Sequence, residues 1–342
     1  MYIAAKAGKN FSPAKINRSA EHLSKPRVLI SRCLLGHKCR YDGKIFTFCE
    51  IKQLKQHFQL IPICPEARLG LNSPRPPIKL IKTRSNWLLH QPASNNYFQE
   101  KITGVLLKYI KNFNLEAMIL KEKSPTCGPQ NCKYYFLKRS SVQGRASGFL
   151  PGLTAKFYPH LPIISETKLQ DSRQLFYFLQ KLYAHFNWRK LLANYSIARL
   201  QKFHADYKLY LLGFSRELVD SLGRMVAEQQ QYNRTELQKQ YYDKFMECLS
   251  LDLNRASWKN VILHGFGHIS EEVSPGEKRK FLNMVEKFSQ EEINNYLQLN
   301  QWLKQKADKY KKDYLRRQKF LNPYPEEINK SLHNCGLTPE PF

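Results

Sequence analysis

Long hydrophobic runs are absent from this sequence of 342 residues. No apolar run approaches the ~18 residues that a membrane-spanning helix needs, so we expect no membrane partner. Residues 1–24 also lack the hydrophobic core and the small-residue cleavage site of a secretory signal. They are polar and mostly basic, and we interpret them as a flexible basic tail of a cytoplasmic protein.

Glycine-rich phosphate-binding motifs are absent as well. The chain contains neither a GxGxxG fingerprint nor a Walker loop. This excludes the common dinucleotide-binding and P-loop classes of protein.

Cysteine is too scarce for a disulfide framework, because only eight cysteines occur in 342 residues. In a reducing compartment such cysteines are buried hydrophobic residues, metal ligands or nucleophiles. Six of the eight lie in the first 132 residues, which favours a site in that part of the chain. Cys248 lies within a helical pattern and is expected to pack in a core, whereas Cys335 is expected to have no specific role.

Acidic residues are scarce: 28 Asp and Glu stand against 55 Lys and Arg, which gives a formal net charge of +27 and a pI of 9.7. A surface of this charge attracts phosphate backbones, so RNA or DNA is a candidate partner. The alternative is that the charges lie on solvated helix faces without a defined partner. Because the basic residues are dispersed along the chain, both interpretations stay open.

Three short apolar runs each have a cysteine at their end or shortly after it. The run at 27–32 precedes Cys33, the run at 59–64 ends in Cys64, and a third run precedes Cys127. In an open α/β sheet, ligands bind in the crevice beyond the carboxyl ends of the strands. We therefore expect these three thiols to form one site.

The first half of the chain alternates strand and helix patterns, which predicts an α/β domain with a parallel sheet and crossover helices over residues 25–168. The expected strands are 27–32, 59–64, 117–121 and 161–165, and the expected helices are 50–58, 98–113 and 153–158. Prolines make residues 72–77 a stiff extended loop.

From residue 169 onward, apolar residues recur at three- and four-residue steps, which predicts an all-α domain over residues 169–342. The expected later helices are 235–252, 256–269, 276–289, 290–304 and 305–320. The glycines that follow His264 argue against a regular helix there, and His204 is expected to be a satisfied core histidine.

Four sequence blocks resemble the signature of the thiouracil desulfidase (TudS-like) family and occur in the family's order. The blocks are Cys33–Gly43, Cys64–Glu66, Pro74–Pro77 and Leu120–Gly128. The second half resembles the YbgA-like helical domain, through the segments Phe203–Lys208, Leu222–Arg224, His264–Gly267 and Gln318–Pro325. The resemblance to the thiouracil desulfidase family implies a chemistry. The resemblance to the YbgA-like domain implies only a fold class.

The resemblance implies a [4Fe-4S] cluster that is held by three cysteines, for which we assign Cys33, Cys64 and Cys127. Thiolates are the usual ligands of such clusters, and the open iron would bind the sulfur of a small thiolated base while water attacks the carbon. This would be a desulfidase reaction without net electron transfer. Glu66 is assigned as the general acid–base and Ser124 as a residue that orients the substrate or relays a proton.

Other assignments stay open beside this one. Cys39 is an alternative third ligand in place of Cys64, and Cys49 and Cys132 are expected to lie outside the ligand set. A structural zinc site could instead use Cys33, Cys39, Cys127 and Cys132, although Cys33-x5-Cys39 is wider than a typical zinc knuckle. Arg68 departs from the family's pattern and is expected to occupy space near the pocket.

The basic helical half permits a further interpretation, in which the protein acts on or binds a nucleic acid. The Lys304–Lys319 segment, which is interleaved with Tyr310 and Tyr314, is either a nucleic-acid contact or a solvated helix face.

Overall fold

The computed structural model describes residues 24–137, 139–289 and 295–341. The predicted tail at residues 1–24 lies outside this part except for its last residue, and the start of the predicted helix at 290–304 also lies outside it. No helix within the described residues is long and apolar enough to cross a membrane.

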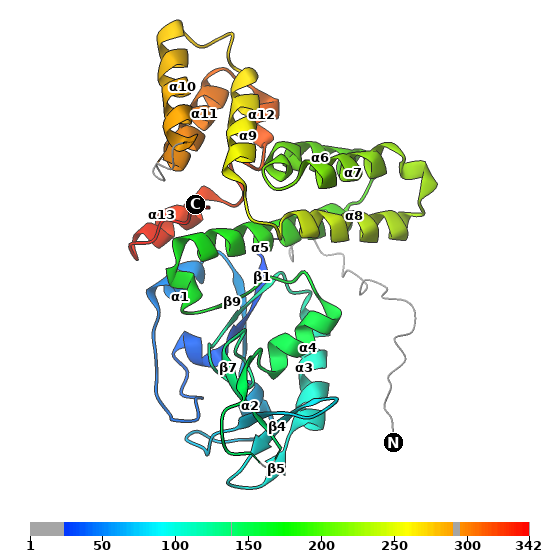
Figure 1. The fold of residues 1–342 in the computed structure, drawn as a ribbon, viewed down its shortest axis with the longest axis vertical. Coiled ribbons are helices and arrows are strands. Elements are labelled where there is room, and N and C mark those ends of the chain that lie inside the picture. Colours follow the sequence, from blue (N-terminus) through cyan, green and yellow to red (C-terminus); the bar gives the residue numbers. More distant parts are fainter. Residues whose placement is uncertain (1–23, 138, 290–294, 342) are drawn as a thin grey trace.

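A four-stranded parallel sheet forms the centre of the first half (Figure 1). Its strand order is β2-β1-β6-β9, and all three pairings are parallel. The strands are β1 (Arg27–Ser31), β2 (Gln59–Ile63), β6 (Ala117–Leu120) and β9 (Ile163–Ser165), which confirms the four predicted strands and the predicted fold class. The chain therefore passes from β1 to β2 on one side and then crosses to β6 on the other side.

Successive residues of these strands enter two different hydrophobic cores, as the period of two in a strand requires. Val28 and Ile30 face a core that also contains side chains of α1 (Cys49–Leu54) and α5 (Ser172–Ala193). Leu29, between them, faces the opposite core, which contains side chains of α3 (Gln99–Phe113) and α4 (Phe149–Phe157). The sheet is thus covered on both faces, as parallel sheets usually are.

A second sheet of five strands was not predicted from the sequence. Its order is β5-β4-β3-β7-β8, and only the β3–β7 pairing is parallel. Its members are β3 (Lys79–Lys82), β4 (Trp87–Gln91), β5 (Asn96–Tyr97), β7 (Cys132–Phe136) and β8 (Gly144–Ala146). These strands have two to five residues each, and polar or charged residues interrupt their apolar ones, so they lack the longer apolar runs of the first sheet.

The second half is helical, as predicted. After α5 it contains α6 (Ile197–Leu212), α7 (Arg216–Ala227), α8 (Arg234–Cys248), α9 (Arg255–Gly267), α10 (Pro275–Ser289), α11 (Asn295–Lys309), α12 (Asp313–Arg317) and α13 (Glu326–His333). Short 3₁₀ segments lie at Arg32–Leu35 (η2), Lys168–Gln170 (η3) and Gln229–Gln231 (η4). Side chains of Ser196, Ser215, Asn233 and Asn254 cap the starts of α6 to α9 by accepting backbone N–H groups.

Three helix predictions need correction. α9 continues through His264 to Gly267, so the glycines there do not interrupt the helix. Gly265 is required by packing, because a Cβ at that position would lie 2.8 Å from the ring of Phe320. The predicted helices at 290–304 and 305–320 are replaced by α11 and the short α12.

Helix α5 was also missed by the sequence analysis, and it lies between the sheet domain and other helices of the second half, such as α6, α9 and α13 (Figure 1). The core that contains Val28 and Ile30 continues through Leu179 and Leu182 of α5 to Trp258 of α9. The predicted boundary near residue 168 stays a prediction, but the sheet and the helical half share this core.

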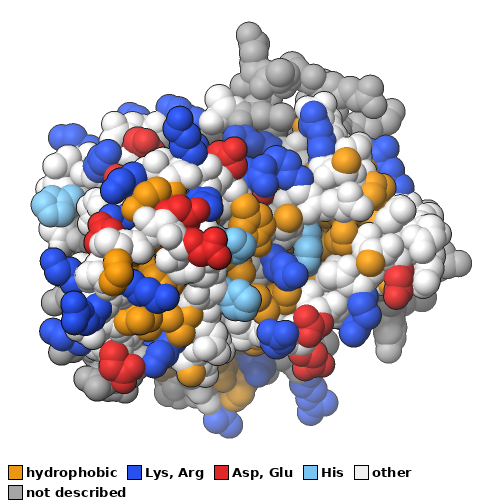
Figure 2. Space-filling view, turned by 90° about the horizontal axis from the view of Figure 1, so that it is seen from above, with side chains coloured by type: hydrophobic (Ala, Val, Ile, Leu, Met, Phe, Trp, Pro, Cys, Tyr) orange, Lys and Arg blue, Asp and Glu red, His pale blue; other side chains and the backbone are white. Residues whose placement is uncertain are grey.

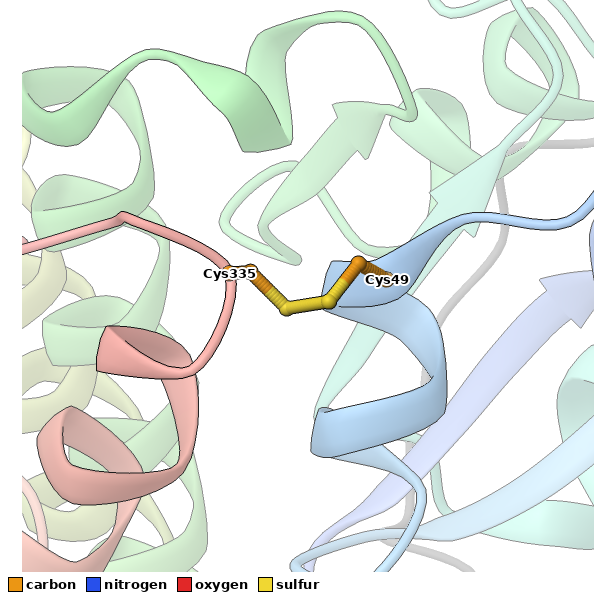
Figure 3. The surroundings of a disulfide bond; sticks show 2 residues. All are labelled: Cys49 and Cys335. Carbon is orange, nitrogen blue, oxygen red and sulfur yellow. A yellow bond between two sulfur atoms is a disulfide. The ribbon is translucent and has the colours of Figure 1, made fainter.

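A disulfide joins Cys49, at the start of α1, to Cys335, just beyond α13 (Figure 3). The two cysteines are separated by 286 residues in the sequence. This corrects the prediction that Cys335 has no specific role, because sequence spacing alone could not pair residues so far apart. Cys248 is fully buried and donates to the carbonyl oxygen of Leu211, which confirms its predicted packing role.

Two partly buried histidines of the helical half form hydrogen bonds with tyrosines. Nδ1 of His185 lies 2.6 Å from the hydroxyl of Tyr242, and Nδ1 of His204 lies 3.1 Å from that of Tyr241. Burial lowers the pKa of each histidine to about 4. His204 is therefore a satisfied core histidine, as predicted.

We expect acid to destabilise this half through the two histidines. The pKa in the unfolded chain is near 6.5, so their contribution is present above that pH and is lost as the pH falls toward 4. The free energy of unfolding at pH 5 should be lower than at pH 7 by roughly 1–2 kcal/mol for each histidine. Urea denaturation at the two pH values measures this difference.

The variant His204→Gln should flatten this pH dependence, and His333→Gln, which changes an exposed histidine of α13, should leave it unchanged. An unaltered pH dependence in His204→Gln would contradict the assignment.

Candidate functional site

A cavity of about 560 Å³ lies at the carboxyl ends of β1, β2 and β6. Because the chain leaves β1 toward β2 on one side and returns to β6 on the other, this is the topological switch point of the sheet. The lining includes every residue that the sequence analysis assigned to the site: Cys33, Cys39, Cys64, Glu66, Ser124 and Cys127.

Each cysteine reaches the cavity from a different local structure. Cys33 lies in η2 directly after β1, Cys64 lies between β2 and the short helix α2 (Pro65–Arg68), and Cys127 lies in the turn after β6. Cys39 comes from the loop after η2 and is 8% exposed. The parallel strands thus bring together three thiols that are up to 94 positions apart in the sequence (Cys33 and Cys127).

The thiols interact with one another. The pKa of Cys39 is raised, first by its hydrogen bond with Cys33, and the pKa of Cys64 is raised, first by its hydrogen bond with Cys39 and then by burial. Burial, followed by the negative charge of Cys64, raises the pKa of Cys127 to about 12. Ionising several of these thiols therefore requires a compensating positive charge, which a bound metal group supplies.

The donor set fits an iron–sulfur cluster in its chemistry, because all four groups are thiols that converge on one cavity. Within the described residues, no three His, Cys, Asp or Glu side chains lie close enough to hold a single metal ion. Cys33 and Cys127, together with Cys64 or Cys39, would hold such a cluster. Both Cys39 and Cys64 lie in the cavity, so the choice between them as third ligand stays a prediction.

Cys132 does not join this set. It is fully buried, and its Sγ lies 2.9 Å from the carbonyl oxygen of Ser124 and 3.5 Å from that of Gly128. A Cβ at Gly128 would lie 2.3 Å from this sulfur, so glycine is required there. Cys132 therefore supports the turn that carries Cys127, and the zinc site that would use it as fourth ligand is not assembled.

Glu66 and Ser124 belong to one hydrogen-bonded chain. Thr126 donates from Oγ1 to Oε1 of Glu66 over 2.9 Å, and Oγ of Ser124 lies 3.0 Å from the same hydroxyl. Because Thr126 donates its only hydroxyl proton to the carboxylate, Ser124 is the donor to Thr126. The cavity therefore contains a continuous path for a proton from Ser124 to Glu66.

Arg75 was not assigned a role from the sequence, although the block Pro74–Pro77 contains it. Its Nε and Nη2 donate to Oε2 of Glu66 over 2.7 and 2.5 Å, and Nη2 also donates to the carbonyl oxygen of Cys39 over 3.1 Å. The proline-rich loop, which includes a cis Ser73–Pro74 bond, has no regular structure, as predicted, and holds the guanidinium in this place. Arg75 thus compensates the charge of Glu66 and fixes its orientation.

Arg68 lies elsewhere. Its guanidinium donates to the hydroxyl of Tyr109 on α3 and lies 5.0 Å from the centre of that ring. The prediction that Arg68 occupies space near the pocket is therefore wrong, because α2 directs this side chain toward α3.

The rim of the cavity is basic and carries aromatic side chains. Tyr41 is 48% exposed, and Tyr135 lies with its ring centre 4.6 Å from Nζ of Lys79. Five rim cations form no ion pair with a carboxylate of the described residues: Arg32, Lys79, Lys123, Lys133 and Arg145. Strands β3, β7 and β8 supply part of this rim through Lys79, Lys133 and Arg145, so the second sheet, which the sequence did not predict, extends the site.

Comparison with known proteins gives two family matches. Residues 28–166 match the family described as 2-thiouracil desulfurase, and residues 208–325 match a family of proteins of unknown function, DUF1722. The uncharacterised protein YbbK of Bacillus subtilis is 32% identical over 155 residues, which are 42% of this chain and 98% of that protein. The matches confirm the predicted resemblance and, with it, the predicted enzyme class, a desulfidase.

Among solved structures, the chain is similar to the [4Fe-4S]-dependent thiouracil desulfidase TudS. The likeness has 24% sequence identity and a TM-score of 0.34, and it covers 42% of this chain and 93% of that one.

Proposed function

Because the chain belongs to the 2-thiouracil desulfurase family through residues 28–166, we propose that it removes sulfur from a thiolated pyrimidine base by hydrolysis of the carbon–sulfur bond. Water supplies the new oxygen and hydrogen sulfide carries the sulfur away, so electrons balance without an oxidant or a reductant. The observation that carries the proposal is the chain Ser124–Thr126–Glu66 beside four thiols in one cavity.

Cys33, Cys64 and Cys127 are the proposed ligands of a [4Fe-4S] cluster, with Cys39 as the alternative to Cys64. When bound, such a cluster supplies an iron that acts as a Lewis acid with a preference for sulfur. Thr126 and the turn around Cys127 are held rigidly, because backbone N–H groups at the start of α4 donate to the carbonyl oxygens of Pro125 and Thr126 over 2.9 and 2.8 Å.

Glu66 is the proposed general base. Its carboxylate accepts a proton from the attacking water, directly or through Ser124 and Thr126, and returns it to the departing sulfur. Arg75 keeps the carboxylate oriented toward the cavity and balances its charge. Ser124 also accepts the backbone N–H of Cys127 over 3.1 Å, so one hydroxyl links the proton path to a proposed ligand.

The ligand assignment predicts a pattern of iron loss. Single replacement of Cys33, Cys64 or Cys127 by Ser should remove most of the bound iron and the absorption near ~400 nm of anaerobically purified protein, because thiolates hold such clusters. Cys248→Ser is the matched control, since that thiol lies in the helical half and should retain the iron. Retention of iron by Cys64→Ser together with its loss in Cys39→Ser would make Cys39 the third ligand.

The acid–base assignment predicts that Glu66→Gln binds iron normally but loses desulfidation of 2-thiouracil by about 100-fold or more, because an amide cannot shuttle the proton. Release of sulfide under single-turnover conditions is the measurement. The control is Glu122→Gln, which changes a carboxylate of the same cavity that accepts a hydrogen bond from Thr167 instead of Thr126. Full turnover by Glu66→Gln would remove Glu66 from the mechanism.

The basic rim favours a second candidate, in which the thiolated base belongs to an RNA or DNA strand. A free pyrimidine base is uncharged, so it does not account for five unpaired cations and the exposed Tyr41 around the cavity. Lysine, arginine and stacking aromatic side chains are the usual contacts of single-stranded nucleic acid.

The Lys304–Lys319 segment supports this candidate less than the rim does. Most of its charges are paired with carboxylates: Lys304 with Glu326, Lys306 with Glu277, Lys312 with Glu272, Arg316 with Asp308 and Asp313, and Arg317 with Asp206. On the face of the helical half seen in Figure 2, Lys and Arg side chains are spread around a central group of hydrophobic side chains.

For this candidate we expect the double variant Lys133→Met/Arg145→Met to lower activity on a thiolated oligonucleotide by about tenfold or more and to reduce its dependence on salt, because fewer counterions are released. Activity on free 2-thiouracil should change little. Lys108→Met, on the exposed face of α3, is the control. Equal losses on both substrates would contradict a role for the rim in binding phosphates.

A further inference from the structure

A second cavity, of about 460 Å³, lies at the opposite edge of the first sheet. Pro26 immediately precedes β1 and His57 precedes β2, so this cavity adjoins the amino ends of the strands whose carboxyl ends form the desulfidase site. Its other walls come from α5, α11 and the segment that leads into α13. It is therefore a separate site between the two halves of the chain.

The segment Gln318–Pro325, which the proposed function leaves without a role, supplies one wall. Lys319, Asn322, Pro323, Tyr324 and Pro325 all line the cavity. Gln318 is fully buried, and its amide donates to the carbonyl oxygen of Ala205 over 2.8 Å, which holds the segment against α6.

Three lysines from three different elements line this cavity: Lys190 of α5, Lys304 of α11 and Lys319 after α12. Lys304 is paired with Glu326. Neither Lys190 nor Lys319 forms an ion pair with a carboxylate among the described residues. Asp206, whose charge acts on Lys319, is already paired with Lys202 over 3.1 Å and with Arg317 over 3.4 Å.

The two unpaired lysines line the same cavity, and the charge of Lys190 acts on Lys319. Burial lowers the pKa of Lys319, and the positive charge of Lys190 lowers it further. Burial also lowers the pKa of Lys190, whose Nζ lies 4.3 Å from the centre of the Phe186 ring. A bound anion would pair with both ammonium groups and so offset the free-energy cost of keeping them charged in the cavity.

We propose that this cavity binds a phosphate group, which Lys190 and Lys319 contact directly and for which Lys304 exchanges its pairing with Glu326. Phosphate suits the site because ammonium groups that arrive from three elements can each meet a different oxygen. The carboxylates of Glu326 and Glu327 lie in the lining as well and restrict the anion to the lysine side. The phosphate can belong to a small molecule or to a polynucleotide.

The walls of the cavity are tied to each other across the two halves. Gln56 and His57, in the turn after α1, each lie 2.8 Å from the hydroxyl of Ser331 on α13, and a disulfide joins Cys49 at the start of α1 to Cys335 just beyond α13 (Figure 3). These links fix the position of the helical half relative to the sheet. The lysines of the cavity are therefore held in place before a phosphate binds.

Isothermal titration calorimetry on the full-length protein tests the proposal with three probes: inorganic phosphate, a nucleoside monophosphate and a short single-stranded oligonucleotide. All titrations use the same ionic strength, set with chloride. We expect saturable binding of at least one probe, and the probe that binds most tightly identifies the source of the phosphate. Lys190→Met and Lys319→Met should each weaken it by about tenfold or more.

Glu326→Gln should strengthen binding, because it frees Lys304, and a gain of affinity cannot arise from misfolding. Lys280→Met, which changes an exposed lysine of α10, is the control and should bind as the unaltered protein does. Absence of saturable binding for all three probes would overturn the proposal, and so would equal affinity in the unaltered protein and both Lys→Met variants.

Discussion

The parallel pairing of β1 with both β2 and β6 is the constraint on which the site depends. Val28 pairs with Leu60 on one side and with Ala117 on the other, so the three strands end at the same edge of the sheet. Thiols from three distant parts of the chain therefore meet without any local motif that joins them. A shift of one strand by a single residue would turn its buried side chains to the opposite face and withdraw its cysteine from the cavity.

The sequence was informative where a periodic pattern ended in a reactive side chain. Strands β1, β2, β6 and β9 are short apolar runs, and the cysteines that follow three of them gave the place of the site. The second sheet could not be predicted in this way, because its strands have only two to five residues and β3 pairs with β7, more than 50 residues later in the chain. The helix α5 was missed for a related reason: its apolar residues occur almost all round the helix, since it is buried between the sheet and the other helices.

Within the site, the assigned side chains lie in one cavity, but the partners that orient them were not foreseen. Thr126 connects Ser124 to Glu66, and Arg75 lies against Glu66 from a loop nine positions away (66 to 75). These contacts depend on the directions in which loops run after they leave the sheet, and sequence spacing does not specify those directions. The same limit applies to Cys132 and Arg68. Both lie close to functional residues in the sequence, but neither lines the cavity.

The disulfide between Cys49 and Cys335 makes the chain between them a covalent ring that includes most of both halves. A break in any one peptide bond inside this ring leaves the two resulting pieces attached to each other. Proteolytic nicking of a surface loop thus opens the ring without releasing a fragment until the disulfide is reduced. The protein's integrity as one molecule then depends on the redox state of its surroundings as well as on the continuity of its backbone.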